Sequence, residues 1–94
     1  MPDKDIRLLI QALGGQLFGK QSDPTGTVAM LISETVRFRD KLKEDTGEIL
    51  TVADTQVALD GLEKHLNGEL LPKDLTSEQK ALAQIWIDRL TLFK

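Results

Sequence analysis

Apolar residues recur with a helical period in four segments of the chain, and this pattern constrains the fold more than any other feature. In the first segment, Ile6, Leu9, Ile10, Leu13 and Leu17 have the spacing that lines one face of a helix. No segment shows convincing strand alternation. The spacing predicts helices over about residues 4–18, 24–45, 52–67 and 77–93. Short connectors place sequential helices antiparallel, so we expect an all-α, antiparallel up-down four-helix bundle that forms one domain over residues 1–94.

Local signals at the helix ends support these boundaries. Asp23 can cap the second helix, with Pro24 at its first position. Gly47 is a typical C-terminal stop, because glycine adopts the left-handed conformation there without strain. The third helix is expected to start at Thr51, with Asp54 as its partner in an acidic capping box.

The later helices carry equally specific signals. Leu59, Leu62 and Leu66 predict the inner stripe of the third helix, which Asn67-Gly68 should end. In the fourth helix, Thr76 and Gln79 have the spacing of a capping box, in which each residue's side chain bonds to the backbone amide of the other.

The stretch GGQLFGKQ, residues 14–21, differs at one position from a phosphate-binding loop. Gly14, Gly19 and Lys20 match that pattern, while Gln21 replaces the Ser or Thr that would ligate magnesium. Such a loop also needs a strand before it and a helix directly after its lysine, whereas residues 6–13 have a helical period and residues 21–24 form a turn. We therefore interpret the stretch as a glycine-rich helix end, and Gly14-Gly15 as the point where the first helix either kinks or stops. No nucleotide cofactor is expected.

Composition narrows the functional classes. The 94 residues are 40% hydrophobic and 29% charged, which is typical of one globular domain. The absence of cysteine excludes disulfides, thiolate metal sites and thiol nucleophiles. The net charge of −3, with both signs interleaved, argues against nucleic-acid binding, which usually needs a basic stripe. The charged N-terminus and the absence of a long apolar run predict a cytoplasmic protein without a signal peptide or membrane span.

No catalytic or metal-binding constellation is visible. His65 is the only histidine, lies at the edge of an apolar stripe, and has no evident catalytic or metal-binding partner. The acidic run 43–48 resembles a calcium loop only superficially. If Gly47 held the sixth position, Leu42 and Ala53 would occupy the first and last ligand positions. We therefore expect a protein that is not an enzyme and that uses no catalytic residue, metal or cofactor.

The fourth helix has an apolar arc wider than a core-facing stripe usually needs. Ala83, Ile87 and Leu90 extend the face formed by Leu82, Ile85, Trp86, Leu92 and Phe93, and we expect Ile87 to be the hardest of these to bury. Arg89 lies within the arc. Either its methylene groups cover neighbouring aromatics while its guanidinium stays in water, or it is the centre of a partner-binding surface. This predicted C-terminal surface consists of Ile87, Arg89, Leu90, Phe93 and Lys94.

The segment ALDGLEKHLNGELLPKDLTSEQKALAQIW and the apolar and basic C-terminus IDRLTLFK resemble the immunity proteins of pediocin-like (class IIa) bacteriocins. The likeness covers most of the chain in helix order and spacing and is tightest from Val57 to Ile85. The resemblance implies a non-enzymatic cytoplasmic protector that acts at the inner face of the membrane. Its partner would be the mannose phosphotransferase permease with bound bacteriocin, and the C-terminal half would select the bacteriocin.

A second interpretation is open at this point. As an alternative, the chain is compatible with a small helical regulatory or adaptor protein that acts through protein-protein contacts. In that case the arc of the fourth helix would pair with another protein or with a second copy in a homodimer. The sequence leaves the oligomeric state and the identity of the partner open.

Overall fold

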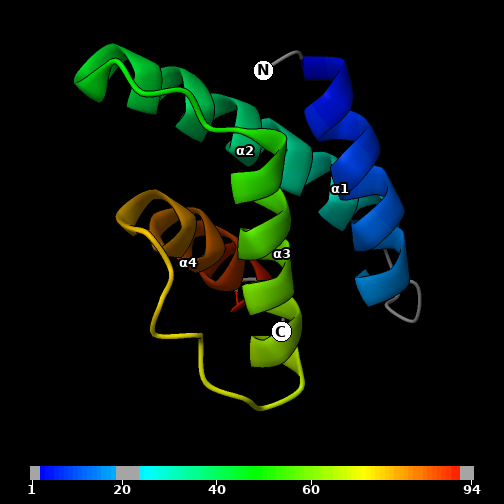
Figure 1. Ribbon diagram of the computed structural model, residues 1–94. Coiled ribbons are helices and arrows are strands. Elements are labelled where there is room, and N and C mark those ends of the chain that lie inside the picture. The colour runs from blue at the N-terminus through cyan, green and yellow to red at the C-terminus, as the bar shows by residue number, and fades with distance from the viewer. Residues whose placement is uncertain (1–2, 19–23, 92–94) are drawn as a thin grey trace. The chain divides into compact units, whose positions relative to one another are not determined.

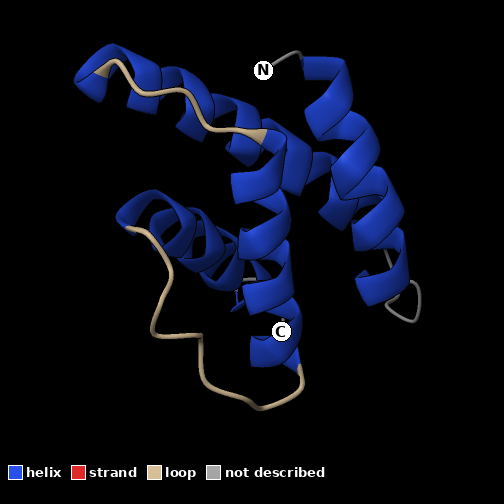
Figure 2. Ribbon diagram, in the orientation of Figure 1, coloured by secondary structure: helices blue, strands red, loops and turns tan. Residues whose placement is uncertain are grey.

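The computed structural model describes residues 3–18 and 24–91, which contain four α-helices (Figure 1). They are α1 (Asp3–Phe18), α2 (Pro24–Thr46), α3 (Val52–Leu66) and α4 (Ser77–Thr91). No strand occurs within the described ranges (Figure 2). The prediction of an all-α fold with four helices is confirmed. The chain divides into two compact units, Met1–Val52 and Ala53–Lys94, which are described separately below; the single domain stays a prediction.

The first helix runs through the glycine pair. Because α1 extends to Phe18, the alternative in which the helix stops at Gly14-Gly15 is wrong. Each glycine costs a helix only about 1 kcal/mol relative to alanine, which does not by itself end it. The backbone of residues 6–13 is helical rather than extended, as expected, and therefore lacks the strand that a phosphate-binding loop requires. Gly19, Lys20 and Gln21 lie outside the described residues.

In the first unit, α1 packs against α2. Ile6 and Ile10, one helical turn apart on α1, are fully buried. Thr27, Leu31 and Thr35 form a buried stripe at four-residue spacing on α2. The hydroxyl of Thr35 donates a hydrogen bond to the carbonyl oxygen of Leu31 at 2.6 Å, which satisfies a polar group that would otherwise be costly to bury.

The second helix ends where the sequence predicts. Gly47 has a φ of 76°, and its amide donates to the carbonyl of Lys43 at 2.9 Å. Thr46 adds two bonds, because its hydroxyl donates to the carbonyl of Leu42 and accepts from the amide of Glu48. Residues 43–48 are exposed. The acidic run is thus the solvated end of a helix, in agreement with its interpretation from sequence. The cap expected at Asp23 lies outside the described residues, whereas α2 does begin at Pro24.

The core of the second unit comes from one face of each helix. On α3, Thr55, Ala58, Leu59 and Leu62 are buried at the expected helical spacing. Leu66 was expected to complete this stripe, but it is 38% exposed. It occupies the last turn of the helix, directly before the residues that end it, and the prediction for Leu66 is wrong. The buried residues of α4 are Leu82, Ala83, Trp86, Ile87 and Leu90.

The third helix ends in a Schellman motif, the arrangement in which two amides beyond the helix bond back to its last turn. Gly68 has a φ of 82°, and its amide donates to the carbonyl of His65 at 3.0 Å. The amide of Glu69 donates to the carbonyl of Lys64 at 2.8 Å. The predicted stop at Asn67-Gly68 is confirmed.

The segment 67–76 between α3 and α4 is called the strap below, and it agrees within one residue with the connector that the predicted helix bounds leave. The strap packs on α3 at Gly61, which is buried and has no side chain. A Cβ atom at Gly61 would lie 3.3 Å from Cδ2 of Leu71 and 3.8 Å from Cδ1 of Leu75. Because residue 61 is a glycine, Leu71 and Leu75 can approach α3 more closely than a larger side chain at that position would allow. The strap carries the chain back beside α3 rather than turning tightly.

Candidate functional site

The start of α4 is fixed by a capping box. The amide of Thr76 donates to Oε1 of Gln79 at 3.0 Å, and the amide of Gln79 donates to Oγ1 of Thr76 at 3.2 Å. Both reciprocal bonds predicted from the sequence are present. They satisfy two backbone amides that no carbonyl within the helix can reach, so the junction between the strap and α4 has a defined geometry.

Gln79 also links α4 to α3. Its amide nitrogen Nε2 donates to Oδ1 of Asp54 at 3.1 Å, across 25 residues of sequence, in a partly buried position. Asp54 lies in the first turn of α3, which begins at Val52, directly after the predicted start residue Thr51. One side chain therefore holds the strap junction and the N-terminal turns of both helices. Sequence reasoning assigned Gln79 to the capping box alone, because helical spacing carries no signal for a contact across 25 residues.

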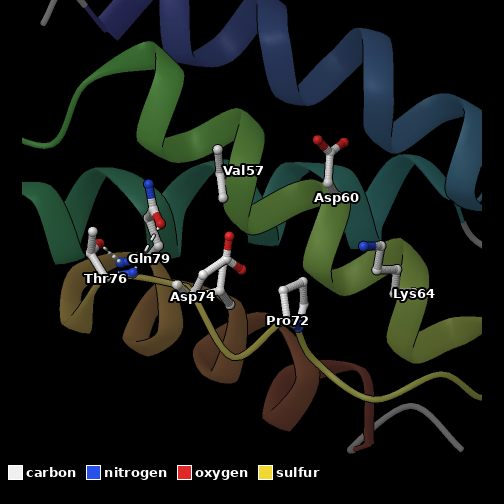
Figure 3. Close-up of a pocket in the computed structure, with 8 residues that line it drawn as sticks. Val57, Asp60, Lys64, Pro72, Asp74, Thr76 and Gln79 are labelled. Carbon is white, nitrogen blue, oxygen red and sulfur yellow. Dashed lines mark hydrogen bonds between the residues drawn. The ribbon is translucent and has the colours of Figure 1, made fainter.

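A groove with a volume of about 460 Å³ lies along the strap within the second unit (Figure 3). One side is formed by residues of α3, and the other by residues of the strap and the start of α4. This volume falls within the range of small-ligand sites in proteins. The lining residues are Val57, Asp60, Lys64, Pro72, Asp74, Leu75, Thr76 and Gln79.

The groove combines apolar surface with unpaired charges. Val57, Pro72 and Leu75 supply apolar contact, and Leu75 and Pro72 are half-buried. Asp60 and Asp74 supply carboxylates, and Lys64 supplies one ammonium group. Within the described residues, no hydrogen bond or ion pair joins these three charged groups to another side chain. A ligand with both apolar and charged groups would therefore meet complementary chemistry that the chain itself leaves unused.

The predicted C-terminal surface is only partly described by the structure, and its role in binding stays a prediction. Ile87 and Leu90 are 8% and 7% exposed, so Ile87, expected to be the hardest residue of the arc to bury, is buried. Leu82, Ala83 and Trp86 are buried as well, so these five residues of the arc are buried in the folded chain. Arg89 is half-buried and makes an interaction of its own. Phe93 and Lys94 lie outside the described residues, as does Leu92.

Two further features bear on the classes of site considered from the sequence. His65 is exposed, as the interpretation of a surface or boundary histidine predicted. Among the described residues, no group of three or more His, Cys, Asp or Glu side chains is placed to hold a metal ion. In the same residues, none of the helices combines the length and the apolar character needed to cross a membrane.

Comparisons with known proteins identify no relative of this chain. No family model matches the chain, and neither a curated protein nor a solved structure gives a significant match. The groove, the strap and the bond between Gln79 and Asp54 are thus interpreted from the physical chemistry of this chain alone.

Proposed function

We propose that the protein is a bacteriocin immunity protein that protects its cell by binding and without catalysis. It would act in the cytoplasm, at the inner face of the membrane. Its partner would be a receptor with bound bacteriocin, for which the mannose phosphotransferase permease is the candidate that the family resemblance implies.

The observation that carries this proposal is the organisation of residues 53–91. The resemblance is tightest from Val57 to Ile85, and these residues fold as α3, the strap and most of α4 within one compact unit. The strap is held by Gly61 at one point and by Gln79 at another. A pre-ordered surface favours a binding role, because little conformational entropy is lost when a partner docks on it.

Arg89 remains the residue of the predicted C-terminal surface with a described, accessible side chain. It is half-buried in the last turn of α4. Arginine is enriched among residues that dominate binding energy at interfaces. We propose that Arg89 contributes to the contact with the receptor assembly, together with Phe93 and Lys94, while Ile87 and Leu90 support it from the core.

The test is protection of a sensitive cell. The chain is expressed in a strain sensitive to pediocin-like peptides, which is then challenged with a panel of them. Selective survival against one or a few peptides is expected, and the double variant Arg89→Glu, Lys94→Glu should lose it. Lys41→Glu, a charge reversal on the exposed side of α2, is the matched control and should still protect. Uniform killing across the panel, with the protein present at full level, would count against the proposal.

A specific observation also favours the second candidate, a helical adaptor that acts through protein-protein contacts. Leu70 in the strap is 87% exposed, and Leu8 and Ile49 in the first unit are more than half exposed. Covering such side chains in an interface removes apolar surface from water, which favours association with another protein. If the adaptor forms a homodimer through Leu70, the variant Leu70→Asp should be monomeric in sedimentation experiments at concentrations where the parent is dimeric.

A further inference from the structure

We propose that the groove between α3 and the strap binds a short peptide segment in which a basic side chain is flanked by apolar residues. The inference goes beyond the proposed function and does not depend on it. It rests on the shape of the groove, the apolar residues that line it and the balance of its unpaired charges. The occupant is defined by chemistry: an arginine or lysine side chain between two apolar neighbours.

The charged residues that line the groove favour a positively charged ligand. The residues that line the groove include two carboxylates, those of Asp60 and Asp74, and one ammonium group, that of Lys64. Lys64 follows Asp60 by four residues on the same helix, the spacing at which a Lys side chain can turn toward an acidic one. Pairing of these two would still leave the carboxylate of Asp74 without a partner among the described residues. The groove therefore presents a net negative charge to a ligand, and an anionic ligand would be repelled.

The apolar surface selects an organic ligand over a free metal ion. Val57 on α3 is 37% exposed, and Pro72 and Leu75 lie across from it on the strap. These side chains can be covered by aliphatic groups, and their removal from water would favour binding. A basic side chain with apolar neighbours satisfies both the carboxylates and the apolar residues.

The two walls are held in place before any ligand binds. Leu71 and Leu75 pack on Gly61, which fixes the strap against α3. Gln79 bonds to Asp54 and closes the capping box with Thr76, so the end of the groove beside α4 is also fixed. Figure 3 shows the side chain of Asp74 extending from the strap toward α3, on which Asp60 and Lys64 lie. A site with fixed walls binds without the cost of ordering them.

Peptide binding by the purified full chain tests the proposal. The probes are three fluorescein-labelled, end-capped pentapeptides: Ala-Leu-Arg-Leu-Ala and its counterparts with glutamine or glutamate at the centre. Fluorescence anisotropy should give the tightest binding for the arginine peptide and the weakest for the glutamate peptide. Asp60→Asn and Asp74→Asn should each weaken binding of the arginine peptide by about two- to fivefold, as expected for an exposed ion pair. Lys64→Gln should strengthen it by a similar factor.

The control and the location of binding complete the test. Asp45→Asn removes an exposed carboxylate at the end of α2 and should leave the affinity unchanged. In amide NMR spectra, the signals of Val57, Leu75 and Gln79 should shift as the arginine peptide is added. Equal affinities for the three peptides, affinities unaffected by Asp60→Asn and Asp74→Asn, or no binding up to about 1 mM would each overturn the proposal. Because the protection assay uses whole cells and other substitutions, its outcome is separate from this one.

Discussion

Three hydroxyl groups of α2 and the side chain of Gln79 on α4 form hydrogen bonds that span very different numbers of residues. On α2, Ser33, Thr35 and Thr46 each donate to a carbonyl four residues earlier, and the ion pair of Arg37 with Glu34 joins adjacent turns. In the second unit, Gln79 bonds across 25 residues to Asp54. Local bonds stabilise a helix wherever it lies, whereas the bond of Gln79 also sets where one helix begins relative to another.

The candidate binding groove includes Gln79, which forms the long-range hydrogen bond to Asp54. The groove needs two walls from different elements, α3 and the strap, and therefore needs contacts that fix one against the other. Gly61 and Gln79 supply such contacts. Variants of these residues, compared with a variant of Ser33 on α2, test whether the long-range contacts contribute more to stability than a local hydrogen bond.

The largest effect is expected at Gly61. The variant Gly61→Val places methyl groups where Leu71 and Leu75 now pack, and overpacking of this kind costs about 1–3 kcal/mol. The free energy of unfolding, measured by urea denaturation with circular dichroism, should fall by that amount, and the affinity for the arginine peptide should fall with it. Gly61→Ala is the matched milder variant, because the tightest contact of its Cβ is with the end of the Leu71 side chain at 3.3 Å, while Leu75 at 3.8 Å is in ordinary van der Waals contact. A Gly61→Val protein as stable as the parent would contradict the close packing of the strap.

An intermediate effect is expected at Gln79. The variant Gln79→Ala loses its part in the capping box and the bond to Asp54, and a loss of about 1–2 kcal/mol is expected from a cap and a hydrogen bond together. Gln84→Ala is the matched control. Gln84 donates only to Asp88 one turn along the exposed surface of α4, so its removal should cost about 0.2–0.5 kcal/mol. Equal losses in the two variants would remove the distinction drawn between local and long-range bonds.

The smallest effect is expected on α2. Ser33 is exposed, and its hydroxyl donates to the carbonyl of Ala29 at 3.1 Å. The variant Ser33→Ala loses this local bond but gains helix propensity, so the free energy of unfolding should change by no more than about 0.5 kcal/mol. Urea denaturation under the conditions used for Gln79→Ala provides the measurement. A loss as large as that of Gln79→Ala would show that local bonds on α2 are as important as the bond between the helices.

The sequence predicted features that arise from neighbouring residues. Pro24, Gly47 and Gly68 mark helix ends because each acts through its own backbone, and the capping box of Thr76 with Gln79 closes within one turn. The α-helical period likewise predicted the burial of Leu59 and Leu62 on α3. Each of these features is determined by a few consecutive residues, so it does not depend on how the remainder of the chain folds.

Features that depend on distant residues were missed or misjudged. Ile87 was expected to be the hardest residue of its arc to bury, yet it is buried, because burial depends on contacts with other elements that helical spacing does not encode. The role of Gly61 was invisible for a similar reason, since a glycine within a helix pattern gives no sign that Leu71 packs on it. The groove was missed because its walls are separated in sequence, and no motif links Asp60 to Asp74.

The bond between Asp54 and Gln79 has an electrostatic consequence. Each residue lies in the first turn of its helix, so the N-terminal ends of α3 and α4 lie beside each other. Both ends carry the positive pole of a helix dipole, and the two poles would repel. The first turn of α3 contains Asp54, and the first turn of α4 contains Glu78. These negative charges offset the positive poles of both helices. The Asp54 carboxylate therefore accepts the hydrogen bond from Gln79 and also reduces the repulsion between the two helix ends.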